Sequence, residues 1–157
     1  MNNNSTPVID NSGLLELEQK LKQLENTAKT KVLYSSLIKG AKILLDATKL
    51  ELRKSMGDAA INPIRKRNGN EGTWKPLIDG IRMSGDKPYC EVKVHIMGHG
   101  FLRWFEKGTQ LRRTQSGANR GAIKALNFFF NAKESNKTNI ENAITANLDK
   151  EINKILN

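Results

Sequence analysis

Two histidines and a single cysteine have the side chains that could bind a metal ion or act as a nucleophile. His95 and His99 are four residues apart, which is the spacing of two zinc ligands on a helix. However, apolar and polar residues alternate from 90 to 97 and predict a strand, on which Cys90 and His95 point to opposite faces. We therefore expect no metal site and no Cys–His pair, and we expect Cys90 to be a buried apolar side chain.

Glu106 is the only acidic residue in the aromatic and basic stretch from 101 to 124. A carboxyl group there could act as a general acid or base. We instead expect Glu106 to form an ion pair with Arg103 or with an arginine of the following segment. That pair could form within one subunit or across a subunit boundary. The glycines at 69–72 and 117 lack the strand and lysine context of a phosphate-binding loop. The sequence therefore predicts a protein that is not an enzyme and uses no cofactor.

Positive charge is concentrated in two segments of a chain whose net charge is +10. Residues 53–75 include six basic and two acidic side chains, and residues 101–124 include six basic and one acidic. Glycine and proline predict exposed loops over 57–78 and 108–121. These loops carry Arg65, Lys66, Arg67, Arg112, Arg113 and Arg120. Local basic loops indicate an acidic partner, which is either nucleic-acid phosphate or the carboxylates of a protein.

Aromatic residues flank the second basic segment. Phe101, Trp104 and Phe105 have the spacing of one helical turn, and we expect this turn to face the core. If the rings were exposed, they would instead form a stacking platform for single-stranded nucleic acid. Phe128 and Phe129 lie in the apolar segment from 123 to 132 and are predicted to form a second core anchor.

The other segments predict the elements that must position these side chains. Residues 1–12 are polar and predict a flexible arm, and residues 13–157 form one domain. Apolar residues at helical spacing predict helices over 14–28 and 33–52, with a bend or stop near 26–27. A short strand over 78–83 precedes the strand over 90–97. A capping-box pair, Thr138 and Glu141, predicts a final amphipathic helix. The order predicts an α+β domain with long N-terminal helices, a small antiparallel β-sheet and a C-terminal amphipathic helix.

The chain shows neither a long apolar run nor the charge and apolar pattern of a secretory leader. One cysteine cannot form an internal disulfide, which fits a reducing cytoplasm. We therefore expect no membrane partner.

A strand, an aromatic cluster and a Glu-x-Gly-Thr element follow one another in this chain. The signature reads Arg103-Trp104-Phe105-Glu106-Lys107-Gly108-Thr109. Together with the preceding helix over 36–53 and the apolar run over 120–129, it resembles the tail-completion or head–tail joining proteins (neck, minor tail component) of long-tailed double-stranded-DNA bacteriophages. The similarity covers roughly residues 13–156. Two features depart from that family: the segment 72–77 lacks its usual Ala-Pro-x-x-Thr-Gly-x-Leu pattern, and no proline precedes the last helix.

The resemblance implies a structural virion protein, assembled in the bacterial cytoplasm. Such proteins form a closed homo-oligomeric ring, with a hexamer favoured, between the capsid connector and the tail tube or its terminator, and double-stranded DNA passes through the lumen. A tail terminator ring and a nonspecific nucleic-acid-binding module stay open as alternatives.

Within such a ring the basic loops need a location. A lumen lined with arginine would grip DNA that has to slide during ejection, so we expect the loop over 108–121 to meet neighbouring subunits. The loop containing residues 65–67 is expected at the opposite face, with the lumen as its alternative. The predicted partner or subunit interface comprises Arg65, Lys66, Arg67, Arg103, Glu106, Gly108, Thr109, Arg112, Arg113 and Arg120.

Overall fold

The computed structural model describes residues 12–22, 24, 26–60, 64–67, 70–73, 76–96 and 100–156, with the backbone alone at 12, 14, 59, 64–67 and 70–73. Its elements are α1 (Ser12–Lys22), α2 (Asn26–Met56), η1 (Gly57–Ala60), β1 (Ile64–Arg67), β2 (Asn70–Thr73), η2 (Leu77–Gly80), β3 (Ile81–Asp86), β4 (Glu91–Ile96), α3 (Leu102–Lys107), β5 (Arg112–Arg113), β6 (Asn119–Gly121) and α4 (Phe128–Leu156). The predicted α+β class is confirmed, with long helices and small antiparallel ladders. The predicted N-terminal arm lies outside the described residues, apart from Ser12.

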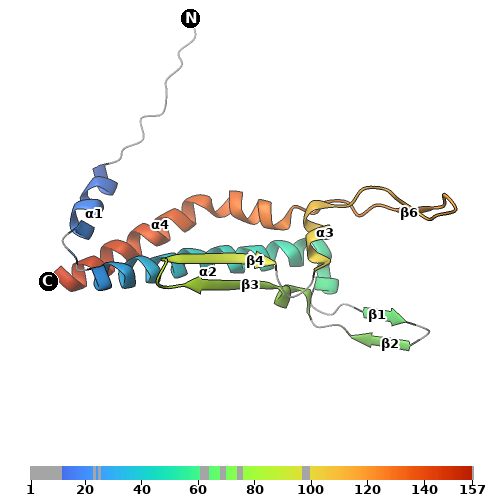
Figure 1. Cartoon of the computed structure of the whole chain (residues 1–157), viewed down its shortest axis with the longest axis horizontal. Helices are drawn as coiled ribbons and strands as arrows, with labels where there is room; N and C mark the ends of the chain where they lie inside the picture. The colour runs from blue at the N-terminus through green and yellow to red at the C-terminus, as the bar shows by residue number, and fades with distance from the viewer. Residues whose placement is uncertain are drawn as a thin grey trace, which may run out of the picture.

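Helices α2 and α4 run in opposite directions side by side and form the long axis of the molecule (Figure 1). Small residues on α2 allow the two helices to approach closely: Ser36, Gly40, Ala41 and Thr48 are all buried. A Cβ atom placed on Gly40 would lie 2.7 Å from Cδ1 of Ile144 in α4, so no other side chain fits there without a shift. Within the described part of the chain, no helix is long and apolar enough to cross a membrane.

Two apolar clusters stabilise the ends of this helix pair. The larger one lies at the α3 end, and its buried members are Leu52, Ala60, Leu77, Ile81, Leu102 and Phe128. The smaller one joins α1 to the far end of α4 through Leu17, Leu24, Val32 and Ile152. Between the clusters, Asn147 donates a hydrogen bond to the buried hydroxyl of Ser36 at 3.0 Å. The two helices favour one register, because only that register buries both apolar clusters and also forms the polar contact between them.

The described chain contains three two-stranded antiparallel hairpins. β3 and β4 pair from Ile81 with Ile96 to Asp86 with Glu91 and lie along α2. β3 begins three residues later than the predicted strand over 78–83, whereas β4 lies within the predicted 90–97. At the turn end, Gly85 lies against the hydroxyl group of Tyr34, where a Cβ atom would overlap that side chain.

The two predicted basic loops contain hairpins rather than irregular chain. β1 pairs with β2, and β5 pairs with β6 across a register shift at Arg112 and Arg113. Figure 1 shows both hairpins projecting from the α3 end of the molecule, away from α1 and the C-terminus. The expectation that they lie at opposite faces of a ring stays a prediction, because it depends on how the subunits are arranged.

Helix α4 begins at Phe128, ten residues before the predicted capping box at Thr138. That prediction is wrong because the group that caps α4 comes from α3 and not from a neighbouring residue in the sequence. Thr138 and Glu141 are instead exposed residues inside the helix. The predicted weakness near 26–27 corresponds to the boundary between α1, which ends at Lys22, and α2, which begins at Asn26.

Candidate partner-binding arm and its anchor

The carboxylate of Glu106 caps the first turn of α4. Its Oε2 atom accepts a hydrogen bond from the backbone N–H of Phe129 at 2.9 Å, and Oε1 accepts one from Phe130 at 3.1 Å. The first N–H groups of a helix have no partner within the helix, and a negative charge there also interacts favourably with the helix dipole. Among the described residues of this chain no arginine pairs with Glu106, which instead caps α4, and a pair across a subunit boundary stays a prediction.

Gly108 follows α3 in a conformation that only glycine adopts easily. Its φ angle is +73°, and a Cβ atom would lie 2.9 Å from the carbonyl oxygen of Ile123 and 3.0 Å from the backbone nitrogen of Ala125. The backbone of residue 108 therefore turns while it lies directly against the returning chain. A side chain at this position would be strained by both the angle and the contact.

Thr109 closes the base of the segment that follows. Its backbone N–H donates to the carbonyl oxygen of Ile123 at 2.9 Å, and its Oγ1 atom accepts from the N–H of Ile123, also at 2.9 Å. On the helix side, the backbone N–H of Leu126 donates to the carbonyl oxygen of Phe105 at 2.8 Å. The backbone N–H of Asn127 donates to the backbone carbonyl oxygen of Glu106 at 3.2 Å. We call these contacts of Glu106, Gly108 and Thr109 the clamp, because they join α3, the start of α4 and the chain between them.

The clamp holds a projecting hairpin, residues 110–122, which we call the arm (Figure 1). At its tip, the N–H of Thr114 donates to the carbonyl oxygen of Ala118 at 2.8 Å. The N–H of Gly117 donates to the carbonyl oxygen of Thr114 at 3.0 Å. The Thr114 hydroxyl oxygen also accepts from Ala118 N–H at 3.0 Å. The tip is therefore ordered by its own backbone and hydroxyl groups, and it does not rest on the body of the molecule.

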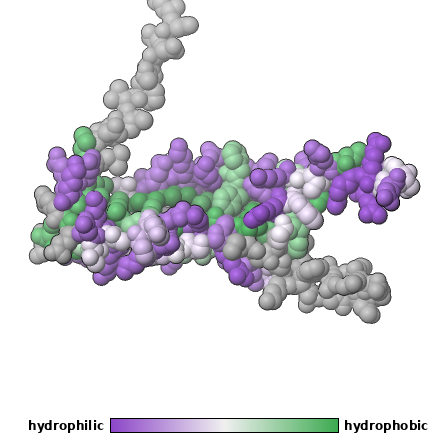
Figure 2. All heavy atoms as spheres, viewed as in Figure 1, coloured by the Kyte–Doolittle hydropathy of each residue, from purple (hydrophilic) through white to green (hydrophobic). Residues whose placement is uncertain are grey.

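Arginines dominate the charge of the arm. Arg112, Arg113 and Arg120 are exposed, and none of them takes part in the ion pairs found in the described chain. Figure 2 shows the arm as a largely hydrophilic projection beside the apolar band between α4 and β4. The backbone of Arg65, Lys66 and Arg67 forms β1 in the second hairpin at this end, and their side chains lie outside the described part.

The aromatic anchor differs from the predicted one at Trp104. Phe101 and Phe105 pack edge to face, with ring centroids 6.2 Å apart, and both contact the larger core cluster. Phe128 is fully buried in that cluster, and Phe129 packs against it. Trp104 is 52 % exposed, so its prediction as a core residue is wrong. Leu102 takes the buried position because the inward face of α3 contains 101, 102 and 105. The aromatic pattern alone did not single out this residue.

Cys90 and His95 do not come together as a reactive pair. Cys90 lies in the turn before β4 with a φ angle of 49°, and its thiol donates weakly to the carbonyl oxygen of Thr30 at 3.7 Å. His95 is in β4, and His99 lies outside the described residues. No cluster of three His, Cys, Asp or Glu side chains suited to a metal ion occurs in the ranges that the structure describes.

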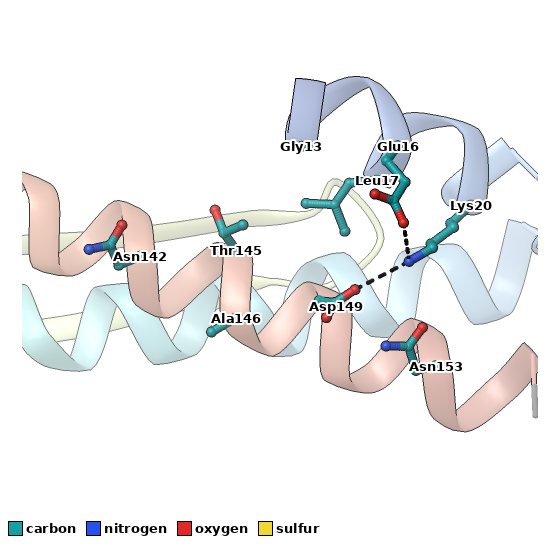
Figure 3. A pocket seen from close by; sticks show the side chains of 9 residues that line it. All are labelled: Gly13, Glu16, Leu17, Lys20, Asn142, Thr145, Ala146, Asp149 and Asn153. Carbon is teal, nitrogen blue, oxygen red and sulfur yellow. Dashed lines mark ion pairs between the residues drawn. The ribbon is translucent and has the colours of Figure 1, made fainter. Parts of the chain in front are cut away.

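Two open grooves lie on the body. One, of about 390 Å³, lies between β4 and α3, where Arg103 and Lys107 line it together with the clamp carboxylate. The other, of about 590 Å³, separates α1 from α4 (Figure 3). There Lys20 lies between Glu16 at 2.8 Å and Asp149 at 3.5 Å. Hydrogen bonding to Glu16 raises the pKa of Lys20.

Comparisons of this chain with protein-family models, with curated proteins and with solved structures found no match.

Proposed function

We propose that this chain is a structural subunit of a phage neck, namely a ring-forming head–tail joining component between the capsid connector and the tail tube. The observation that supports it most strongly is the clamp. Glu106, Gly108 and Thr109 are the Glu-x-Gly-Thr residues of the sequence signature, and each has a defined role in holding a projecting arm on a rigid body.

The shape of the subunit suits assembly better than chemistry. Its charged hairpins project away from the core, while the carboxylate in the groove beside α3 already accepts two backbone hydrogen bonds. A projecting element that meets a different surface of the next copy makes a heterologous contact. Such contacts form a closed ring when the rotations between successive copies add up to a full turn. A stiff arm loses less entropy on docking than a loose loop.

Electron microscopy and mass spectrometry of purified phage particles test the proposal. We expect the chain in virions, in a ring at the head–tail junction, and its gene between those of a connector and a tail-tube protein. Deletion of the gene should leave DNA-filled heads and separate tails. Absence of the chain from purified virions contradicts the proposal, and a ring at the far side of the junction, on the tube itself, identifies a tail terminator instead.

Complementation links this function to the clamp. A deletion phage supplied with Glu106→Ala should form fewer joined particles than one supplied with Glu141→Ala, which removes an exposed carboxylate from the middle of α4. Equal numbers of joined particles from the two variants would show that the clamp is not needed for assembly.

A further inference from the structure

We propose that the arm binds double-stranded DNA through its phosphates, so that the end of the subunit carrying both basic hairpins faces the DNA. This inference deepens the proposed function by naming the partner of the arm, and its test uses the purified chain without any ring. It differs from the expectation that the arm meets a neighbouring subunit.

The first support is the distribution of charge on the arm. From Lys107 to Lys133 the sequence contains no acidic residue, and its basic residues include Arg112, Arg113 and Arg120 on exposed positions of the hairpin. The three arginines have no carboxylate partner in the described chain. Arginine side chains without internal partners, on a ribbon with no acidic residue, favour binding to a polyanion.

The second support is the position of the other basic hairpin. Strand β1, which contains Arg65, Lys66 and Arg67, projects from the same end of the long helix pair as the arm (Figure 1). The backbones of two hairpins with basic sequences therefore lie at one end of the subunit. A single extended polyanion can approach both of them, whereas separate acidic neighbours would require two matching surfaces.

The third support is the shape and surface of the arm. The arm is a two-stranded antiparallel ribbon with a narrow turn at Thr114–Ala118, and a two-stranded ribbon fits the major groove of B-DNA. Protein–protein interfaces usually have an apolar core, often with aromatic residues. Leu111, 53 % exposed, is the only large exposed apolar side chain on the described arm.

The fourth support is that the carboxylates which a second copy would offer on α1 and at the end of α4 are already paired with lysines of that copy. Where carboxylates gather, on α1 and at the end of α4, lysines of the same chain neutralise them. Glu18 pairs with Lys22 at 2.8 Å, and Glu151 pairs with Lys154 at 2.8 Å. Lys20 in turn lies between Glu16 and Asp149 (Figure 3). A neighbouring subunit's arm that docked on α1 and the end of α4 would therefore meet a surface of nearly balanced charge.

The test measures binding of the purified full-length chain to a fluorescein-labelled 30-base-pair duplex by anisotropy, over 50–200 mM salt. The arm variant is Arg112→Ala/Arg113→Ala/Arg120→Ala. The matched control is Lys39→Ala/Lys42→Ala/Lys137→Ala, which removes the same charge from exposed positions on α2 and α4. The arginines are exposed and unpaired, so circular dichroism should show that both variants fold.

We expect the wild-type chain to bind duplexes of unrelated sequence equally, with affinity falling steeply as salt rises. Each phosphate contact contributes about 0.9 to the slope of log K against log salt, so the arm variant should lose up to about 2.7 from the slope. The control should keep the wild-type slope. A single strand with the same number of phosphates should bind more weakly than the duplex, because it has no groove for the ribbon.

Three outcomes overturn the proposal. One is no duplex binding at 50 mM salt, and another is an equal loss of affinity in the arm variant and the control. The third is arm-dependent binding of polyglutamate without binding of DNA, which would identify an acidic protein as the partner. A ring at the phage neck with any of these results would leave the proposed function standing and reject only the DNA contact.

Discussion

Glu106 in α3 and Phe129 in α4 are 23 residues apart in the sequence, yet the carboxylate of one accepts the backbone N–H of the other at 2.9 Å. This contact lets a short helix of six residues determine where a helix of 29 residues begins. It also joins the chain just before the arm to the chain just after it. The start of α4 and the position of the arm are therefore set by the same side chain.

Replacing Glu106 by alanine should destabilise the protein by about 1–2 kcal/mol, because two N–H groups of α4 lose their acceptor and the helix dipole loses a favourable charge. Chemical denaturation followed by circular dichroism measures the free energy of unfolding. Glu141→Ala is the control, since it removes an exposed carboxylate from the same helix without removing a cap. Equal losses in the two variants would contradict the capping role.

Gly108→Ala should cost more stability than Gly117→Ala. Both glycines have positive φ angles, 73° and 84°, so alanine at either position carries backbone strain of about 1–3 kcal/mol. Only Gly108 also lies against backbone atoms, whereas nothing lies within 4 Å of a Cβ atom on Gly117. We expect a further cost of about 1–3 kcal/mol at Gly108, measured as the difference between the unfolding free energies of the two variants. Equal unfolding free energies of the two variants would mean that the backbone at the base of the arm moves without cost to make room for the added methyl group.

The sequence predicted the elements whose signals are local. Alternation identified β4, helical spacing identified the two N-terminal helices, and the turn of helix after residue 100 was expected. The start of α4 was missed because its cap comes from Glu106, which is remote in the sequence, so the local pair Thr138 and Glu141 was the only signal available. The position of the two basic hairpins at one end was also missed, because only tertiary packing determines it.

Phe128→Ala and Trp104→Ala separate the buried anchor from the exposed aromatic residue. Phe128 is fully buried, so its removal should cost about 3–5 kcal/mol through lost apolar contacts and the cavity left behind. Trp104 is 52 % exposed on α3, and its removal should cost about 1 kcal/mol or less. Thermal unfolding of the two variants under one set of conditions measures the difference. A large loss at Trp104 in the isolated subunit would contradict its exposed position, whereas a loss seen only in assembled rings would place it in an interface.

The close approach of α2 and α4 at Gly40 can be measured with a double-mutant cycle. Gly40→Ala brings two opposing effects, since alanine favours the helix by about 1 kcal/mol but its methyl group would lie 2.7 Å from two carbon atoms of Ile144. In an Ile144→Ala background that overlap disappears, and the gain in helix propensity is opposed only by the milder contact with Cγ2 of Ile140 at 3.1 Å. We therefore expect Gly40→Ala to be less favourable in the wild-type chain than in the Ile144→Ala chain, by about 1–3 kcal/mol of unfolding free energy. Gly13→Ala is the control, because it lies in α1 with nothing within 4 Å of its added Cβ atom. A coupling energy near zero between positions 40 and 144 would show that the two helices can move apart at this point without cost. The helix pair would then not be the close-packed support on which the clamp and the arm depend.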